Sequence, residues 1–284
     1  KEVKENGMSL KLMYITNNVE VAKMAQKAGV DRIWIDLETL GKEERQKGLN
    51  TVKSKHSIED IKNIAPIITS SELLVRVNPW NDNSVEEIEQ VIAAGADVVM
   101  LPMWRSFDEV EAFLNVVNKR TKTTLLLETK EAVEHLDSIL TLPGIDEVHI
   151  GLNDLHLAYH LDFMFEPLVN GLVENICLKL KEANIPFGFG GIARIGEGTL
   201  PAEKILMEHY RLGSSRVILS RTFCNIDKIN DLGKLEPEFI ENVLKIREFE
   251  HSLLETNSVV FEANRKEVAQ QVAMIVKEKR EGSL

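Results

Sequence analysis

Eight short apolar runs that alternate with amphipathic segments predict an α/β fold of the (β/α)8 type, the TIM barrel. Nearly all of these runs are apolar throughout, which is typical of parallel strands that are covered on both faces. Eight such units in roughly 220 residues is the number that a TIM barrel needs. The expected strands are residues 11–16, 32–38, 72–78, 97–103, 123–129, 147–153, 186–192 and 216–222.

Helix signals lie between the expected strands. Asn18 is placed to cap a helix that ends at Gly29, and Ser57 is placed to cap the next helix. Ser84 is followed three residues later by Glu87, which is the spacing of a capping box. A doubly wound open sheet is the alternative arrangement, but no GxGxxG turn follows the first strand, which disfavours a dinucleotide-binding fold.

Composition limits the classes of partner. The chain of 284 residues has 45 acidic and 34 basic side chains, a net charge of −11. No nucleic acid partner is expected, because binding phosphates requires a basic surface. No apolar run reaches the roughly 18 residues of a membrane span, so no membrane partner is expected. Cys177 and Cys224 are too few for a disulfide framework, which favours a cytoplasmic location.

The chain divides into three expected regions. Residues 1–10 are expected to be a disordered or vector-derived terminus, residues 11–235 the barrel, and residues 236–284 additional helices. This tail is longer than an eighth barrel helix requires. It either packs on the same barrel or forms an arm on a neighbouring subunit, and apolar periodicity does not separate the two. A homo-oligomer is expected, since closed symmetric assemblies of one chain are common.

Charged side chains gather at the C-terminal ends of the expected strands, where the active sites of TIM barrels lie. Asp36 and Glu38 end the second strand, Arg76 lies in the third, Glu128 ends the fifth, and Asp154 follows the sixth. Taken singly, each acid is more often a helix cap or an ion-pair partner. Taken together, four carboxylates suit a hard divalent cation such as Mg²⁺ or Mn²⁺, and the arginine suits a substrate carboxylate.

These residues lie in motifs that resemble those of the HpcH/HpaI aldolase/citrate lyase β-chain family, which are barrels of the phosphoenolpyruvate/pyruvate type. The similarity extends in order from about residue 11 to about residue 225. The motifs are "IDLETLGKEERQ", "LLVRVNPW", "GADVVMLPMWRSFDEVEAF" and, as the best match, "LLLETKEAVEHLDSILTLPGIDEVHIGLNDL".

The resemblance implies a divalent-metal-dependent carbon–carbon lyase of the class II aldolase type that acts next to a pyruvate-type enolate. It assigns Glu128 and Asp154 to the metal, which is Mg²⁺ or alternatively Mn²⁺ or Co²⁺. It assigns Arg76 to the 2-oxo acid and the reacting oxygen. The turn of Gly151, Asn153 and Asp154 then holds the carboxylate of this small-molecule substrate. Asp36 and Glu38 occupy the acidic end of the second strand and are expected, with Arg76, to be catalytic.

The sequence departs from the aldolases at Thr39, where they have a histidine that takes part in proton transfer. A threonine hydroxyl does not ionise near neutral pH and is a poor general base. A metal-bound water, Asp36, Glu38 or His56 would have to serve instead. No Schiff-base lysine is required, since only Lys130 lies near a strand end.

Two alternatives remain open. The first is an acyl-CoA thioester lyase of the citrate lyase β-chain or malyl-CoA type, which needs cations for the CoA phosphates. The candidates for that role are Lys42, Arg45, Lys47, Lys53 and Lys55, although a run of charges is usually a solvated face. The second is a barrel that binds metal and a 2-oxo acid without catalysis.

Overall fold

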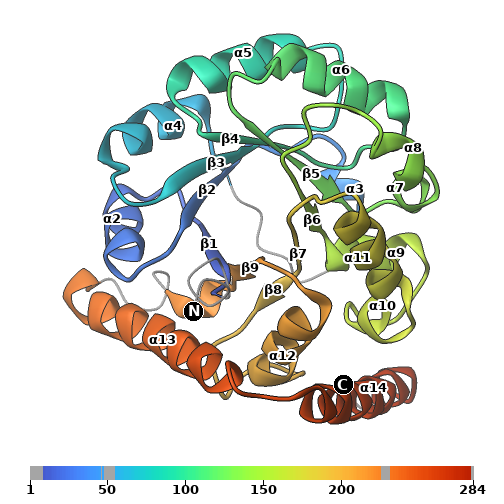
Figure 1. Ribbon diagram of the computed structural model, residues 1–284. Helices are drawn as coiled ribbons and strands as arrows, with labels where there is room; N and C mark the ends of the chain where they lie inside the picture. The colour runs from blue at the N-terminus through green and yellow to red at the C-terminus, as the bar shows by residue number, and fades with distance from the viewer. Residues whose placement is uncertain (1–8, 46, 48–54, 225–230, 283–284) are drawn as a thin grey trace.

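A ring of parallel strands surrounded by helices forms the body of the molecule in the computed structural model (Figure 1). The structure describes residues 9–45, 47, 55–224 and 231–282, so most of the terminus expected at residues 1–10 lies outside it. The strands follow one another in the order β7-β6-β5-β4-β3-β2-β1-β9-β8. They are β1 (Lys11–Ile15), β2 (Arg32–Asp36), β3 (Glu72–Arg76), β4 (Val98–Leu101), β5 (Lys122–Leu127), β6 (Glu147–Ile150), β7 (Phe187–Phe189), β8 (Gly191–Ile192) and β9 (Arg216–Leu219). The predicted TIM barrel is confirmed.

The barrel closes through a strand that is broken in two. The strand expected at residues 186–192 is split into β7, which pairs with β6, and β8, which pairs with β9. Gly190 lies at the break with a φ of +56°. Its N–H donates to Ile150 at 2.9 Å, and its carbonyl accepts from Ile218 at 3.2 Å. One residue therefore bonds to both edges of the sheet and completes a nearly closed ring.

Helices form the outer layer of the barrel (Figure 1). Asn18 caps α2 as predicted, with its side chain accepting the N–H of Val21. The capping box predicted for Ser84 and Glu87 is wrong. The N-cap position is Asn83, whose side chain makes no capping hydrogen bond, and the carboxylate of Glu87 bonds Asn78 instead. The helices are α2 (Val19–Lys27), α3 (Lys42–Arg45), α4 (Ile58–Ile64), α5 (Ser84–Ala94), α6 (Phe107–Val117), α7 (Lys130–Glu134), α8 (Leu136–Ile139), α9 (Leu152–Ala158), α10 (Glu166–Val169), α11 (Leu172–Glu182) and α12 (Ala202–Leu212), with 3₁₀ turns η1 (Ala65–Ile67) and η2 (Arg221–Phe223).

Inward-facing side chains of the barrel are arranged in layers, because every second residue of a strand points inside. On β2 these residues are Arg32, Trp34 and Asp36. Arg32 belongs to a buried ion-pair cluster with Glu147 near the strand starts. Trp34 belongs to a small apolar cluster in the middle of the barrel. Asp36 lies at the opposite end, so the charged mouth is separated from the charged floor by an apolar layer.

A repeated aspartate sets the register at the strand starts. Asp31, Asp97 and Asp146 directly precede β2, β4 and β6. Two residues before each aspartate the chain has a glycine with positive φ. Each carboxylate accepts, at 2.8 Å, a backbone N–H of the preceding strand, β1, β3 or β5 respectively. The underlying Gly-X-Asp repeat was not predicted from the sequence.

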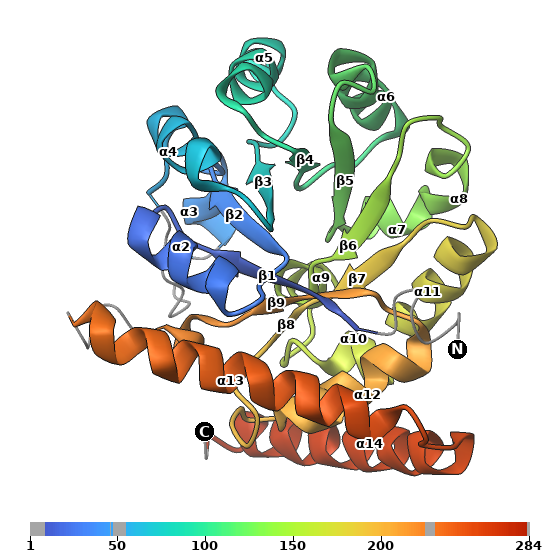
Figure 2. The same cartoon turned by 60° about the vertical axis from the view of Figure 1, so that its left-hand side comes forward.

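Two long helices, α13 (Leu232–Leu253) and α14 (Ser258–Arg280), follow the barrel. Figure 2 shows them running alongside it, with α13 beside α2 and α14 beside α12. Phe239 of α13 packs edge-to-face on Tyr14 of β1, with ring centroids 5.2 Å apart. The tail thus contacts its own barrel, and an additional contact with a neighbouring subunit stays a prediction. Among the described helices, none is long and apolar enough to cross a bilayer.

Candidate active site at the barrel mouth

Asp36 anchors a network of ion pairs at the end of β2. Its carboxylate accepts from Arg76 Nε at 2.8 Å and Nη2 at 2.6 Å, and from Lys42 Nζ at 2.7 Å. Burial by itself would raise the pKa of Asp36, but Arg76 and Lys42 hold that pKa well below its usual value. Asp36 is therefore ionised at neutral pH, and its two bonds to Arg76 fix the plane of the guanidinium. Arg76 also lies over the ring of Trp34, 5.3 Å from its centroid.

Arg45 connects two more of the predicted acids. Its Nη2 donates to Glu38 Oε1 at 2.6 Å, and its Nε donates to Asp154 Oδ1 at 3.2 Å. Glu38 Oε2 in turn lies 3.6 Å from Arg76 Nε. The short helix α3 thereby ties the end of β2 to the first turn of α9 across the mouth.

Glu128 is the acid with the least compensation for its charge. It is 3% exposed, and its Oε1 accepts the backbone N–H of Met103 at 3.0 Å. Burial, and then the charges of Asp154 and Glu38, raise the pKa of Glu128 well above the usual value, and the two nearby arginines oppose this only in part. A carboxyl in such a position either keeps its proton or gains a cation.

The turn at the start of α9 brings the remaining predicted residues to the same place. A Cβ on Gly151 would lie only 2.7 Å from Glu128 Oε2, so the carboxylate lies against the bare backbone of this turn. Asn153 and Asp154 follow in the first turn of α9, and both are half-buried. The structure thus collects all seven predicted site residues, which lie at or just after the ends of β2, β3 and β5 and at the start of α9, at one end of the barrel.

The residues present fit a magnesium-like ion. Among the described residues, no group of three or more His, Cys, Asp or Glu side chains is arranged to hold a metal by itself. Mg²⁺, however, is usually bound by one or two carboxylates while water and substrate oxygens complete its octahedron. Glu128 and Asp154, one of them buried with its charge poorly compensated, match that donor set.

The family model of "HpcH/HpaI aldolase/citrate lyase" matches residues 11–162, more than half of the chain and the part that contains every predicted site residue. This chain belongs to the HpcH/HpaI aldolase/citrate lyase family. The resemblance seen in the motifs is thereby confirmed, and the members of this family are lyases. No curated protein matches the sequence.

Solved structures support the fold of this HpcH/HpaI family member. An HpcH/HpaI aldolase from Desulfitobacterium hafniense is 16% identical, with a TM-score of 0.60 over 77% of this chain and 89% of that one. A family protein from Burkholderia cenocepacia is 17% identical, with a TM-score of 0.58 over 77% and 91%. The citrate synthase SbnG is 15% identical, with a TM-score of 0.59 over 87% and 96%. Identities this low establish the barrel and leave the substrate open.

Thr39, where this family member departs from the aldolases, lies at the exposed rim. The side-chain oxygen of Asn78 accepts the N–H groups of Thr39 at 2.8 Å and Leu40 at 3.0 Å. Asn78 is itself held by Glu87, whose carboxylate accepts its backbone and side-chain N–H groups. The loop after β2 is thus fixed through its backbone, and its threonine hydroxyl supplies no base.

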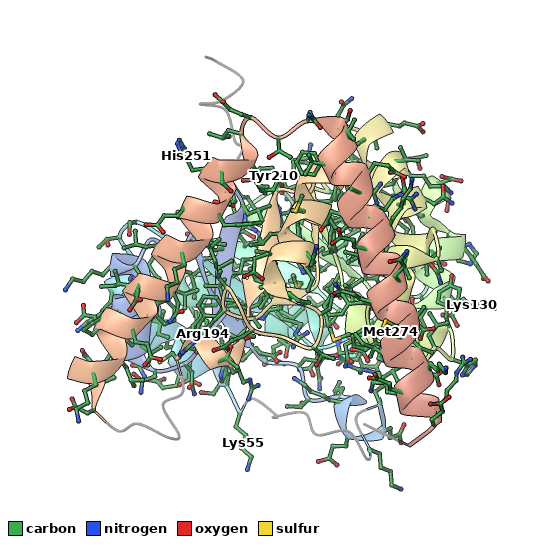
Figure 3. All side chains as sticks on the ribbon, turned by 90° about the horizontal axis from the view of Figure 1, so that it is seen from below. Lys55, Lys130, Arg194, Tyr210, His251 and Met274 are labelled. Carbon is green, nitrogen blue, oxygen red and sulfur yellow. The ribbon has the colours of Figure 1, made fainter. Side chains whose placement is uncertain are left out.

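Two basic residues have a role in the structure that differs from the role expected from the sequence. Lys42 and Arg45 were candidates for binding CoA phosphates, but both bond the acids of the mouth, and Lys42 is only 6% exposed. The signal that could have found them is their place in the loop directly after Asp36 and Glu38. Lys47 is exposed, Lys53 lies outside the described residues, and Lys55 and Lys130 project away from the barrel (Figure 3).

Proposed function

We propose that this protein is a divalent-metal-dependent carbon–carbon lyase that forms or cleaves a bond next to the enolate of a pyruvate-type 2-oxo acid. The observation that supports this most strongly is Glu128, a buried carboxylate without a full counter-charge, inside the mouth of a barrel of this family. A buried charge of this kind is costly for the fold unless it serves a ligand. A divalent cation is the ligand that fits the neighbouring Asp154.

Glu128 and Asp154 would hold Mg²⁺, Mn²⁺ or Co²⁺. Once bound, the cation supplies Lewis-acid stabilisation of negative charge on the 2-oxo acid. Charge balance agrees with this assignment. Lys42, Arg45 and Arg76 match the charges of Asp36, Glu38 and Asp154, so ionisation of Glu128 puts one negative charge in excess. A divalent cation reverses that excess, and a monoanionic 2-oxo acid then neutralises the site.

Arg76 would hold the oxygen on which charge develops. Its bonds to Asp36 use Nε and Nη2, so the Nη1 edge is the one that can meet a substrate oxygen. The guanidinium remains charged, because its pairing with Asp36 and Glu38 outweighs burial and raises its pKa. A donor already oriented in this way needs no reorganisation when the enolate forms, which is how preorganised sites lower a barrier.

The acyl-CoA alternative is disfavoured by Lys42 and Arg45, because their charges are already engaged by acids within the site. Measured binding of a CoA thioester in the micromolar range would reverse this ranking. We expect the small-molecule lyase to act as a cytoplasmic homo-oligomer, as the composition and the common symmetry of such enzymes suggest.

The test begins with protein stripped of metal by EDTA. Addition of Mg²⁺, Mn²⁺ or Co²⁺ should restore decarboxylation of oxaloacetate, a reaction that produces the pyruvate enolate. Glu128→Gln should abolish both metal binding and turnover, whereas Glu131→Gln, which alters a surface acid paired with Arg105, should change neither. Inactivation by borohydride in the presence of substrate would contradict the metal mechanism. Metal-dependent binding of oxalate without any turnover would instead favour a non-catalytic barrel.

A further inference from the structure

His56 reaches the end of β2, the strand whose loop carries Thr39. The backbone N–H of Asp36 donates to His56 Nδ1 at 2.9 Å. The next N–H, that of Leu37, donates to the backbone carbonyl of Arg76 in β3. Successive N–H groups of a strand point to opposite sides, so the N–H of Asp36 points away from β3 and toward β1. Since β1 ends at Ile15, no strand residue meets this N–H, and the imidazole supplies the acceptor. His56 therefore sits at the rim, between the ends of β1 and β2.

This contact selects one form of the ring. A nitrogen that accepts a backbone N–H must keep its lone pair, so in neutral His56 the proton is on Nε2. Burial lowers the pKa of His56, and Lys42 and Arg221 lower it further against the opposing charges of Asp36 and Asp60. The ring is consequently neutral at pH 7. Its Nδ1 is occupied and its Nε2 carries a hydrogen, so neither nitrogen can take up a proton without breaking the contact with Asp36.

We propose that His56 presents Nε2–H as a fixed hydrogen-bond donor to the oxygen of the carbonyl partner that joins or leaves the pyruvate-type enolate. This assignment rests on the proposed lyase function. It gives the site a histidine at the end of β2, the strand whose loop carries Thr39, but with a different role. The aldolase histidine moves a proton, whereas His56 only stabilises negative charge on an oxygen and stays neutral. The proton that a substrate hydroxyl loses on cleavage passes instead to a carboxylate of the mouth, Glu38 or Asp36. The preferred substrates are then those whose bond breaks without a histidine base.

Two isosteric variants separate the donor from the acceptor. In His56→Asn the amide oxygen can replace Nδ1 and still accept from Asp36, but nothing replaces Nε2–H. In His56→Gln the longer side chain places an amide N–H near the position of Nε2 and gives up the Nδ1 contact. His135→Asn is the matched control, because His135 is exposed on the outer helical layer.

The two reactions to compare are cleavage of a 4-hydroxy-2-oxo acid, which leaves a carbonyl partner, and decarboxylation of oxaloacetate, which leaves CO₂. The ratio of their kcat values should fall by about 10²-fold in His56→Asn, the loss typical of removing one preorganised donor. In His56→Gln this ratio should fall much less, by about threefold. Equal falls in both variants, or a larger fall in His56→Gln, would mean that His56 only supports the backbone of Asp36 and would overturn the proposal.

An independent measurement keeps this test separate from that of the lyase function. Nitrogen NMR of labelled protein should show His56 as the Nε2–H tautomer, unchanged between pH 7 and 8. A proton on Nδ1, or titration to imidazolium in that range, would refute the donor even if the enzyme is active. If neither reaction proceeds with any metal, the lyase proposal fails, while the NMR result still decides whether His56 presents an N–H.

Discussion

Replacing Gly151 by alanine tests whether the close approach of backbone and carboxylate shapes the proposed metal site at Glu128. Gly151 has φ −83° and ψ 94°, which alanine adopts without strain, so the effect of the change is steric. The added Cβ would meet Glu128 Oε2 at 2.7 Å and Glu128 Cβ at 3.0 Å. Relief to an ordinary contact of about 3.4 Å requires a shift of about 0.7 Å between these groups.

The magnitude follows from what that shift disturbs. Overpacking costs about 1–3 kcal/mol, and weakening the bond from Met103 N–H to the carboxylate adds about 1–2 kcal/mol. Coordination distances tolerate only about 0.2 Å, so a displacement several times larger should weaken metal binding by about 10–100-fold. We expect the free energy of unfolding in the absence of metal to fall by about 2–5 kcal/mol, the sum of the two effects.

Urea denaturation measures the stability, and calorimetric titration with Mn²⁺ measures the metal affinity. The control is Gly191→Ala, in which the three heavy atoms nearest the added Cβ all belong to Ile218, with its carbonyl oxygen at 3.1 Å. This control should lower stability and leave the metal affinity within about twofold, because no acid of the mouth is displaced. If Gly151→Ala binds Mn²⁺ as tightly as the wild type, Glu128 does not hold the metal and the site is placed wrongly.

Three further predictions concern the charges of the mouth. In metal-free buffer Glu128→Gln should be more stable than the wild type at pH 8, but the two proteins should be equally stable near pH 4. The pKa of Glu128 is raised in the folded state, so the stability of the wild type falls as pH rises above the ordinary carboxyl pKa. A stability difference that does not change with pH in a series of urea melts would show that Glu128 is already neutralised. Asp36→Asn should cost about 3–5 kcal/mol at pH 7, because it leaves Arg76 and Lys42 buried without their anion. Since the pKa of Asp36 is lowered in the folded state, this difference should shrink as pH falls below 4, and a difference independent of pH would exclude the ion pairs as its cause. Arg76→Lys keeps the positive charge but loses the two-point contact with Asp36. The kcat for oxaloacetate should therefore fall by about 10²-fold or more, while the Mn²⁺ affinity changes little. An equal loss of Mn²⁺ affinity would show that Arg76 acts through the metal ligands instead.

Local chemistry of the chain was enough to predict the barrel. Strands that are apolar on both faces require helices on the outside, and the acids and the arginine stand at the strand ends in the sequence itself. Family motifs then placed Glu128, Asp154 and Arg76, and the structure brings them to one mouth. The broken strand at Gly190 was not foreseen, because seven residues that read as one strand are divided by bonds to both sheet edges.

The sequence by itself determined the fold class, the family and the set of charged residues that meet at the mouth, because these depend on periodicity and on residues at strand ends. Tertiary structure alone decided how the charges are paired. Lys42 and Arg45 turn inward to Asp36, Glu38 and Asp154, and Glu128 is left with little compensation. It also decided that His56 comes to the end of β2 and accepts its last N–H, a contact across 20 residues of chain. Such pairings depend on distances between loops, and no spacing along a sequence encodes them.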